Sequence, residues 1–161
     1  LPTCDITSMT AGSLQDFTAI TTATGKVWFE YEGEFKSKSL NMEGTNENGT
    51  ATFSNTVEFK IKGLDKTKGK RLQELLSEPR LTAVVEGTNS TGSNKIGFVV
   101  GWDDILEKDA SGVANVSGVI EGELGGANEY TITFTAEHAE IVRELVGSIE
   151  TNSSSTVTFG S

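Results

Sequence analysis

Residues 113–134 read VANVSGVIEGELGGANEYTITF, and this stretch decides the fold. In its second half, Tyr130, Ile132 and Phe134 stand at every second position with threonines between them. Such alternation is typical of a strand with one buried and one exposed face. The Gly-Gly-Ala-Asn segment at 125–128 is rich in turn-forming residues. The stretch therefore predicts a hairpin with one strand around 113–124 and the other around 130–134.

Strand patterns occur in four further segments, at 27–36, 53–61, 81–86 and 96–102. The first is the clearest, because apolar residues alternate there with a row of acids, Glu30, Glu32 and Glu34. A polar, turn-rich segment separates the first two strands, which predicts a hairpin with a long tip. Turn residues at 87–94 predict another hairpin loop between the last two strands.

Helical patterns occur twice. Asp65 can cap a helix that runs to about Ser77, where Pro79 stops it soon afterwards. A second helix is expected over 136–146, with His138 on its solvent side. A short strand is expected near the end of the chain, at 156–159.

A chain of 161 residues has the length of a single domain. We expect a single domain over 1–161, with an N-terminal arm at 1–24, a β-rich core at 25–146 and a C-terminal tail at 147–161. The fold class expected is mainly β. The simplest architecture that buries this many alternating strands is a β-sandwich or partly closed barrel of six to eight strands with one or two short flanking helices.

The formal net charge of −10 disfavours tight binding to nucleic acid. No apolar run approaches the roughly 18 residues of a membrane-spanning helix, so we expect no membrane partner. The charge is uneven, since residues 60–80 hold seven basic and three acidic residues, a net charge of +4. This segment is either a solvated basic helix or a contact with an acidic surface of an identical neighbour. The candidate subunit interface is Lys66, Lys68, Lys70 and Arg71.

Motifs for chemistry are missing from the sequence. There is one histidine and no nucleophile elbow, phosphate-binding loop or EF-hand spacing. We therefore expect no enzyme activity, no catalytic or metal-binding residues and no cofactor. A lone Cys4 makes no internal disulfide.

Two other functional interpretations of the sequence stay open. One is a hydrolase with a dispersed acidic site. The other is a secreted or surface β-sandwich module that binds a glycan through Trp28 or Trp102. In such a protein the N-glycosylation sequons at Asn48, Asn89, Asn115 and Asn152 would be glycosylated.

The layout resembles the tail tube, or major tail, proteins of long-tailed bacteriophages. The resemblance lies in the strand pair with a long loop at 26–61, the helix at 65–77, and the run 118–124 that turns into 130–134. It implies a structural virion subunit that self-assembles into stacked rings, together with other tail proteins, in the host cytoplasm. The resemblance further implies that the stacked rings enclose a channel through which the viral genome passes, and that an acidic lining of the channel prevents DNA from adhering. Candidate channel-lining acids are Glu30, Glu32, Glu34, Glu121 and Glu123.

Overall fold

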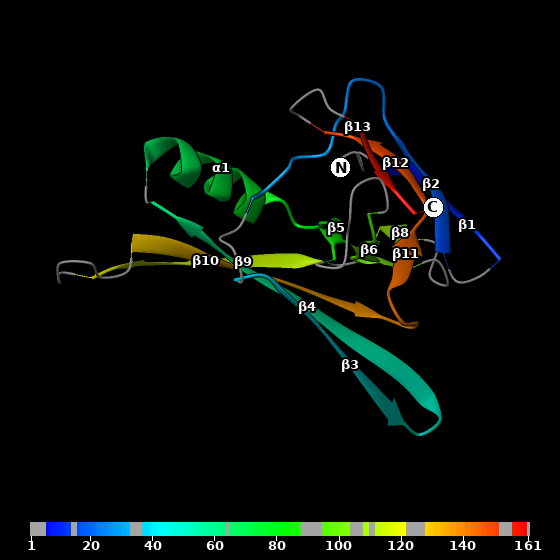
Figure 1. Ribbon diagram of the computed structural model, residues 1–161. Helices are drawn as coiled ribbons and strands as arrows, with labels where there is room; N and C mark the ends of the chain where they lie inside the picture. Colours follow the sequence, from blue (N-terminus) through cyan, green and yellow to red (C-terminus); the bar gives the residue numbers. More distant parts are fainter. Residues whose placement is uncertain are drawn as a thin grey trace.

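The structure is a computed structural model that describes residues 6–13, 16–32, 37–63, 65–87, 95–103, 108–109, 112–121, 128–151 and 156–160. Within these residues the chain is mainly β with one helix, which confirms the expected fold class. The strands form a five-stranded sheet, a four-stranded sheet and two two-stranded sheets, and none of the described sheets closes into a barrel. The arrangement is sandwich-like (Figure 1).

The four-stranded sheet has the order β3-β4-β10-β9, and all its pairs are antiparallel. Its strands are β3 (Ser39–Glu47), β4 (Thr50–Lys62), β9 (Val113–Ile120) and β10 (Asn128–His138). The hairpin expected at 113–134 is confirmed, since β9 pairs with β10. The hairpin loop itself lies outside the described residues.

A tight turn joins β3 to β4. Asn48 and Gly49 both have positive φ, at 53° and 84°. Two such residues make the type I′ turn that the Asn-Gly dipeptide favours, because its twist matches that of the flanking strands. The hairpin partner of β4 is therefore β3, and the expected hairpin with a long tip between 27–36 and 53–61 is wrong.

The five-stranded sheet has the order β1-β2-β11-β6-β5. It contains β1 (Ile6–Ala11), β2 (Asp16–Thr22), β5 (Ala83–Glu86), β6 (Gly97–Val100) and β11 (Arg143–Leu145). The strands expected around 81–86 and 96–102 form the antiparallel pair β5 and β6. Residues 6–22, for which the sequence predicts an arm or first strand, supply two strands of this sheet, and Phe17 on β2 is buried.

Two smaller pairs complete the fold: β12 (Gly147–Glu150) with β13 (Thr156–Phe159), and β7 (Trp102–Asp103) with β8 (Lys108–Asp109). The expected strand at 156–159 is thus confirmed as β13.

Among the described residues, two apolar clusters lie on opposite faces of the five-stranded sheet. The hairpin-side cluster lies under β12 and β13 and contains Phe17, Val99, Leu145, Ile149 and Phe159. The sheet-side cluster lies against the four-stranded sheet and contains Val57, Val100, Phe134, Ala136 and Val142. The five-stranded sheet is therefore the middle layer, because Val99 and Val100 on β6 contribute to opposite clusters.

The helix α1 (Lys66–Ser77) confirms the expectation for 65–77. Asp65 is its N-cap, and its Oδ1 accepts a hydrogen bond from the Lys68 backbone N–H at 2.8 Å. Leu72 is buried, and the helix packs near β9 at one end of the four-stranded sheet (Figure 1).

Two expected elements are wrong. Residues 27–32 form a strap whose strand-like pairing, within the described residues, is the single bridge between Trp28 and Thr151, and residues 33–36 lie outside the described part of the chain. The helix expected over 136–146 is the end of β10 followed by β11. Ala136 and His138 point inward at strand spacing, so His138 is 3% exposed rather than on a solvent-facing helix. Tertiary packing overrides the helical spacing of the apolar residues here.

Candidate interaction surface

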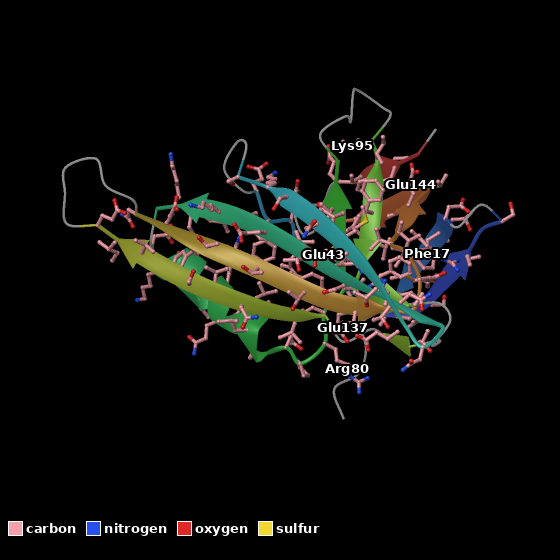
Figure 2. The ribbon with its side chains drawn as sticks, turned by 90° about the horizontal axis from the view of Figure 1, so that it is seen from below. Phe17, Glu43, Arg80, Lys95, Glu137 and Glu144 are labelled. Carbon is pink, nitrogen blue, oxygen red and sulfur yellow. The ribbon has the colours of Figure 1, made fainter. Side chains whose placement is uncertain are left out.

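One face of the four-stranded sheet is open. The register places Val57 opposite Phe134, and both belong to the sheet-side cluster. Since side chains alternate along a strand, the next residues on each strand point to the other side of the sheet. We call that other side the open face. Figure 2 looks onto it and shows Glu43 and Glu137 there.

The open face is polar and acidic. Most of its residues are Ser, Thr and Asn, with Val113 and Val119 along β9. Its ionised side chains are five carboxylates and two ammonium groups: Glu43, Glu47, Glu58, Glu129, Glu137, Lys60 and Lys62. The Nζ of Lys60 lies 2.6 Å from Oε1 of Glu129, so one of the two cations is paired within the face. The uncompensated charge of this surface is negative.

A shallow hollow lies on the open face where β4, β9 and β10 come together. It is lined by Ser54, Val113, Thr135, Ala136 and Glu137. The side chains around it are two hydroxyls, the apolar Val113 and one carboxylate, since the side chain of Ala136 points to the core. Among the described residues, no group of three or more His, Cys, Asp and Glu could hold a metal ion.

Both outer edges of this sheet are open. Within the described residues, β3 pairs only with β4, and β9 pairs only with β10. A single bridge between Leu81 and Gly112 precedes the first residue of β9. The sequence of β9, VANVSGVI, carries no charge and no proline, and Ile120 at its end is 76% exposed. An uncharged open edge of this kind is a template for pairing with another strand.

The hairpin of β3 and β4 projects beyond the rest of the molecule (Figure 1). Every residue from 41 to 52 is exposed, so this part of the hairpin has no core on either face. An isolated two-stranded hairpin is marginally stable in water. The stability of this part of the hairpin therefore depends on the pairing of its two strands and not on a packed core.

The four basic residues predicted as an interface lie together on α1, but they do not have the same surroundings. The Nζ of Lys68 donates hydrogen bonds to the carbonyl oxygens of Lys62, at 2.6 Å, and Gly63, at 3.2 Å. Lys70 forms an exposed ion pair with Glu74 at 3.8 Å, a contact of little energy in water. Lys68 thus ties the helix to the end of β4.

Arg71 lies near the strap of residues 27–32. Burial raises the pKa of the Tyr31 hydroxyl, while the positive charge of Arg71 acts in the opposite direction. The Tyr31 ring also meets Phe59 of β4, with 6.3 Å between ring centroids. The strap therefore packs on the four-stranded sheet through Tyr31, within reach of the charge of Arg71.

The three predicted channel-lining acids that the structure describes are not brought together by a strand. Glu30 and Glu32 are exposed on the strap, whose residues do not alternate between two sheet faces. Glu121 is exposed just after β9. Glu34 and Glu123 lie outside the described residues. The acids that do share a face, such as Glu43 and Glu137, were missed. A signal for Glu43 was the Asn48-Gly49 dipeptide, which favours a two-residue hairpin turn and therefore a strand on each side of it.

The residues singled out for glycan binding have other surroundings. Trp28 and Trp102 are partly buried and pack against the hairpin-side cluster. Asn48 is exposed in the β3–β4 turn and Asn115 is exposed on β9, whereas Asn89 and Asn152 lie outside the described residues. Both indole rings thus have a packing role.

Within the described chain, no helix has the length and apolar character needed to cross a membrane. A scan against models of protein families, a search of curated proteins and a search of solved structures each return no match.

Proposed function

We propose that the protein is a structural subunit that assembles into rings, and that stacked rings form a tube of the bacteriophage tail type. In this proposal the four-stranded sheet is the wall of the channel and its open face is the lining. The observation that carries the proposal is the combination of two open edges and one polar, acidic face on a single sheet.

The direction of the strands supports edge-to-edge assembly. Every neighbouring pair in the order β3-β4-β10-β9 is antiparallel, so β3 and β9 run in opposite directions. A neighbour's β3 placed beside β9 therefore extends the sheet as one more antiparallel strand. Because the two edges differ, this contact is head-to-tail and generates closed rings when the rotation between copies is suitable.

The chemistry of the open face supports a channel for a polyanion. Hydroxyl and amide side chains hold water, and the net negative charge repels phosphate. Among the described residues of this face the carboxylates outnumber the ammonium groups, and Lys60 forms an ion pair with Glu129, which weakens the attraction of the face for phosphate. In the proposed tube the lining is drawn from Glu43, Glu47, Glu58 and Glu137. This assembly is the basis for placing the protein in a virion.

Light scattering after size-exclusion chromatography tests the proposal. The wild-type protein is expected to give particles that grow with concentration. Ile120→Lys puts a charge at the end of the β9 edge, which opposes strand addition, and is expected to give monomers. Ile141→Lys is the matched control, because Ile141 is 45% exposed and lies outside both edge strands. A wild-type protein that stays monomeric at every concentration and salt contradicts the proposal.

A further inference from the structure

We infer the register of the contact between copies: β9 of one copy pairs antiparallel with β3 of its neighbour, with Ile120 opposite Leu40 and Val113 opposite Glu47. The partner is a second copy of this chain. This inference rests on the proposed function and specifies its interface residue by residue.

Strand length and the pleat leave one register. β9 has eight residues and β3 has nine, so only two registers give every residue of β9 a partner. A shift of one residue exchanges the two faces of a strand. One of the two registers would place the core-facing residues of β9 beside the open-face residues of β3. Only the register with Ile120 opposite Leu40 continues both faces of the sheet.

The side chains on the core-facing side fit this register. Ile120, 76% exposed in the single chain, gains the apolar neighbour Leu40. Met42, 43% exposed, lies opposite Gly118, and Gly44 lies opposite Val116. At both of these positions a larger side chain meets a glycine. The contact therefore covers two apolar side chains that the isolated subunit leaves in water, which favours association.

The same register gives the sheet a stagger suited to closure. Within one copy, Leu40, Val57, Phe134 and Ala114 form a row across the four strands. The neighbour's Leu40 lies opposite Ile120, six residues beyond Ala114 on β9. This displacement is about 20 Å along the strand, against about 19 Å across four strands. The two lengths correspond to strands tilted by about 45°, at the upper end of the usual tilt in closed barrels.

Disulfide formation between two single-cysteine variants tests the register. Both are made with Cys4→Ser, which removes the native cysteine. One carries Glu43→Cys and the other Ser117→Cys, and these two exposed positions are directly opposite in the inferred pairing. Directly paired residues lie within disulfide range, whereas residues displaced by two positions lie about 7–8 Å apart. Mixing Glu43→Cys with Asn115→Cys or with Val119→Cys supplies the displaced controls.

Oxidation of the mixed assemblies is expected to link Glu43→Cys to Ser117→Cys about tenfold more efficiently than to either control. Preferential linkage in a control pair overturns the register while the ring proposal stands. Ring-sized particles without linkage in any pair overturn the use of these two edges. Monomers without linkage, from variants that unfold like the wild type, overturn both the register and the proposed function.

Discussion

His138 and Gly101 join the two large sheets through a buried hydrogen bond. The backbone N–H of Gly101, just after β6, donates to Nε2 of His138 at the end of β10, with 2.9 Å between the nitrogens. Because Nε2 accepts, the imidazole ring is unprotonated at that nitrogen. The only histidine of the chain is therefore part of the contact that holds the four-stranded sheet on the middle layer.

Replacing this histidine is expected to destabilise the fold. His138→Leu leaves the buried N–H of Gly101 without an acceptor, which costs about 1–3 kcal/mol. The free energy of unfolding in urea measures the loss. Glu137→Gln, at the neighbouring exposed position, is the control and is expected to change stability by less than about 0.5 kcal/mol. Equal stability of the two variants contradicts the role assigned to this bond.

Gly97 allows the Phe159 ring to lie directly on β6. A Cβ at this position would lie 2.6 Å from the Cδ1 of Phe159. Gly97→Ala is therefore expected to displace the ring and lower the free energy of unfolding by about 1–3 kcal/mol. Gly87→Ala is the matched control, since the nearest atom to its Cβ is 3.7 Å away. A Gly97→Ala protein as stable as the control would show that the ring is not held in this position.

The cap of α1 gives stability a pH dependence with a definite sign. The hydrogen bond from the Lys68 backbone N–H is the main cause that lowers the pKa of Asp65. A lowered pKa means that the stabilisation is present above the ordinary value of about 3.9 and is lost as pH falls through the folded value. The advantage of wild type over Asp65→Ala in chemical unfolding is thus expected to shrink in acid. Asp65→Asn is the control, because it keeps a capping oxygen without the charge. If the wild type is more stable than Asp65→Ala by the same amount at every pH, the charge of the Asp65 carboxylate does not contribute to the cap.

The sequence predicted the elements whose patterns are local. The 113–134 hairpin and the helix at 65–77 were found because alternation, turn residues and a capping aspartate act within a few residues. β3 was missed because its residues are polar on both faces, so no burial pattern marks it. The strap at 27–32 alternates like a strand, but Trp28 contacts the hairpin-side cluster whereas Tyr31 contacts Phe59. Residues that serve different layers cannot be distinguished from a strand by spacing alone.

The sequence indicates the charge of the surface but not which residues share a face. Acidity and a basic helix are visible in composition, and the structure keeps Lys66, Lys70 and Arg71 exposed on α1. Which acids share a face depends on register, and the register depends on the β3–β4 turn. Glu30 and Glu32 lie on the strap and not on that face, and a role for them in lining a channel stays a prediction.

The predicted basic interface can now be tested without disturbing the fold. Lys66→Glu, Lys70→Glu and Arg71→Glu together reverse three exposed charges and keep Lys68, whose hydrogen bonds tie α1 to β4. If these residues contact an acidic neighbour, the concentration needed for assembly is expected to rise by about tenfold, equivalent to about 1.4 kcal/mol. Light scattering across protein concentrations measures this change. Assembly at the wild-type concentration would show that the segment is a solvated helix face.

Negative-stain electron microscopy of the purified protein over a range of concentrations tests the central claim most directly. The proposed use of the two open sheet edges predicts rings of uniform diameter with a central channel, and stacks of such rings at high concentration. A field of single compact particles at every concentration and ionic strength, from protein that is folded, would contradict it.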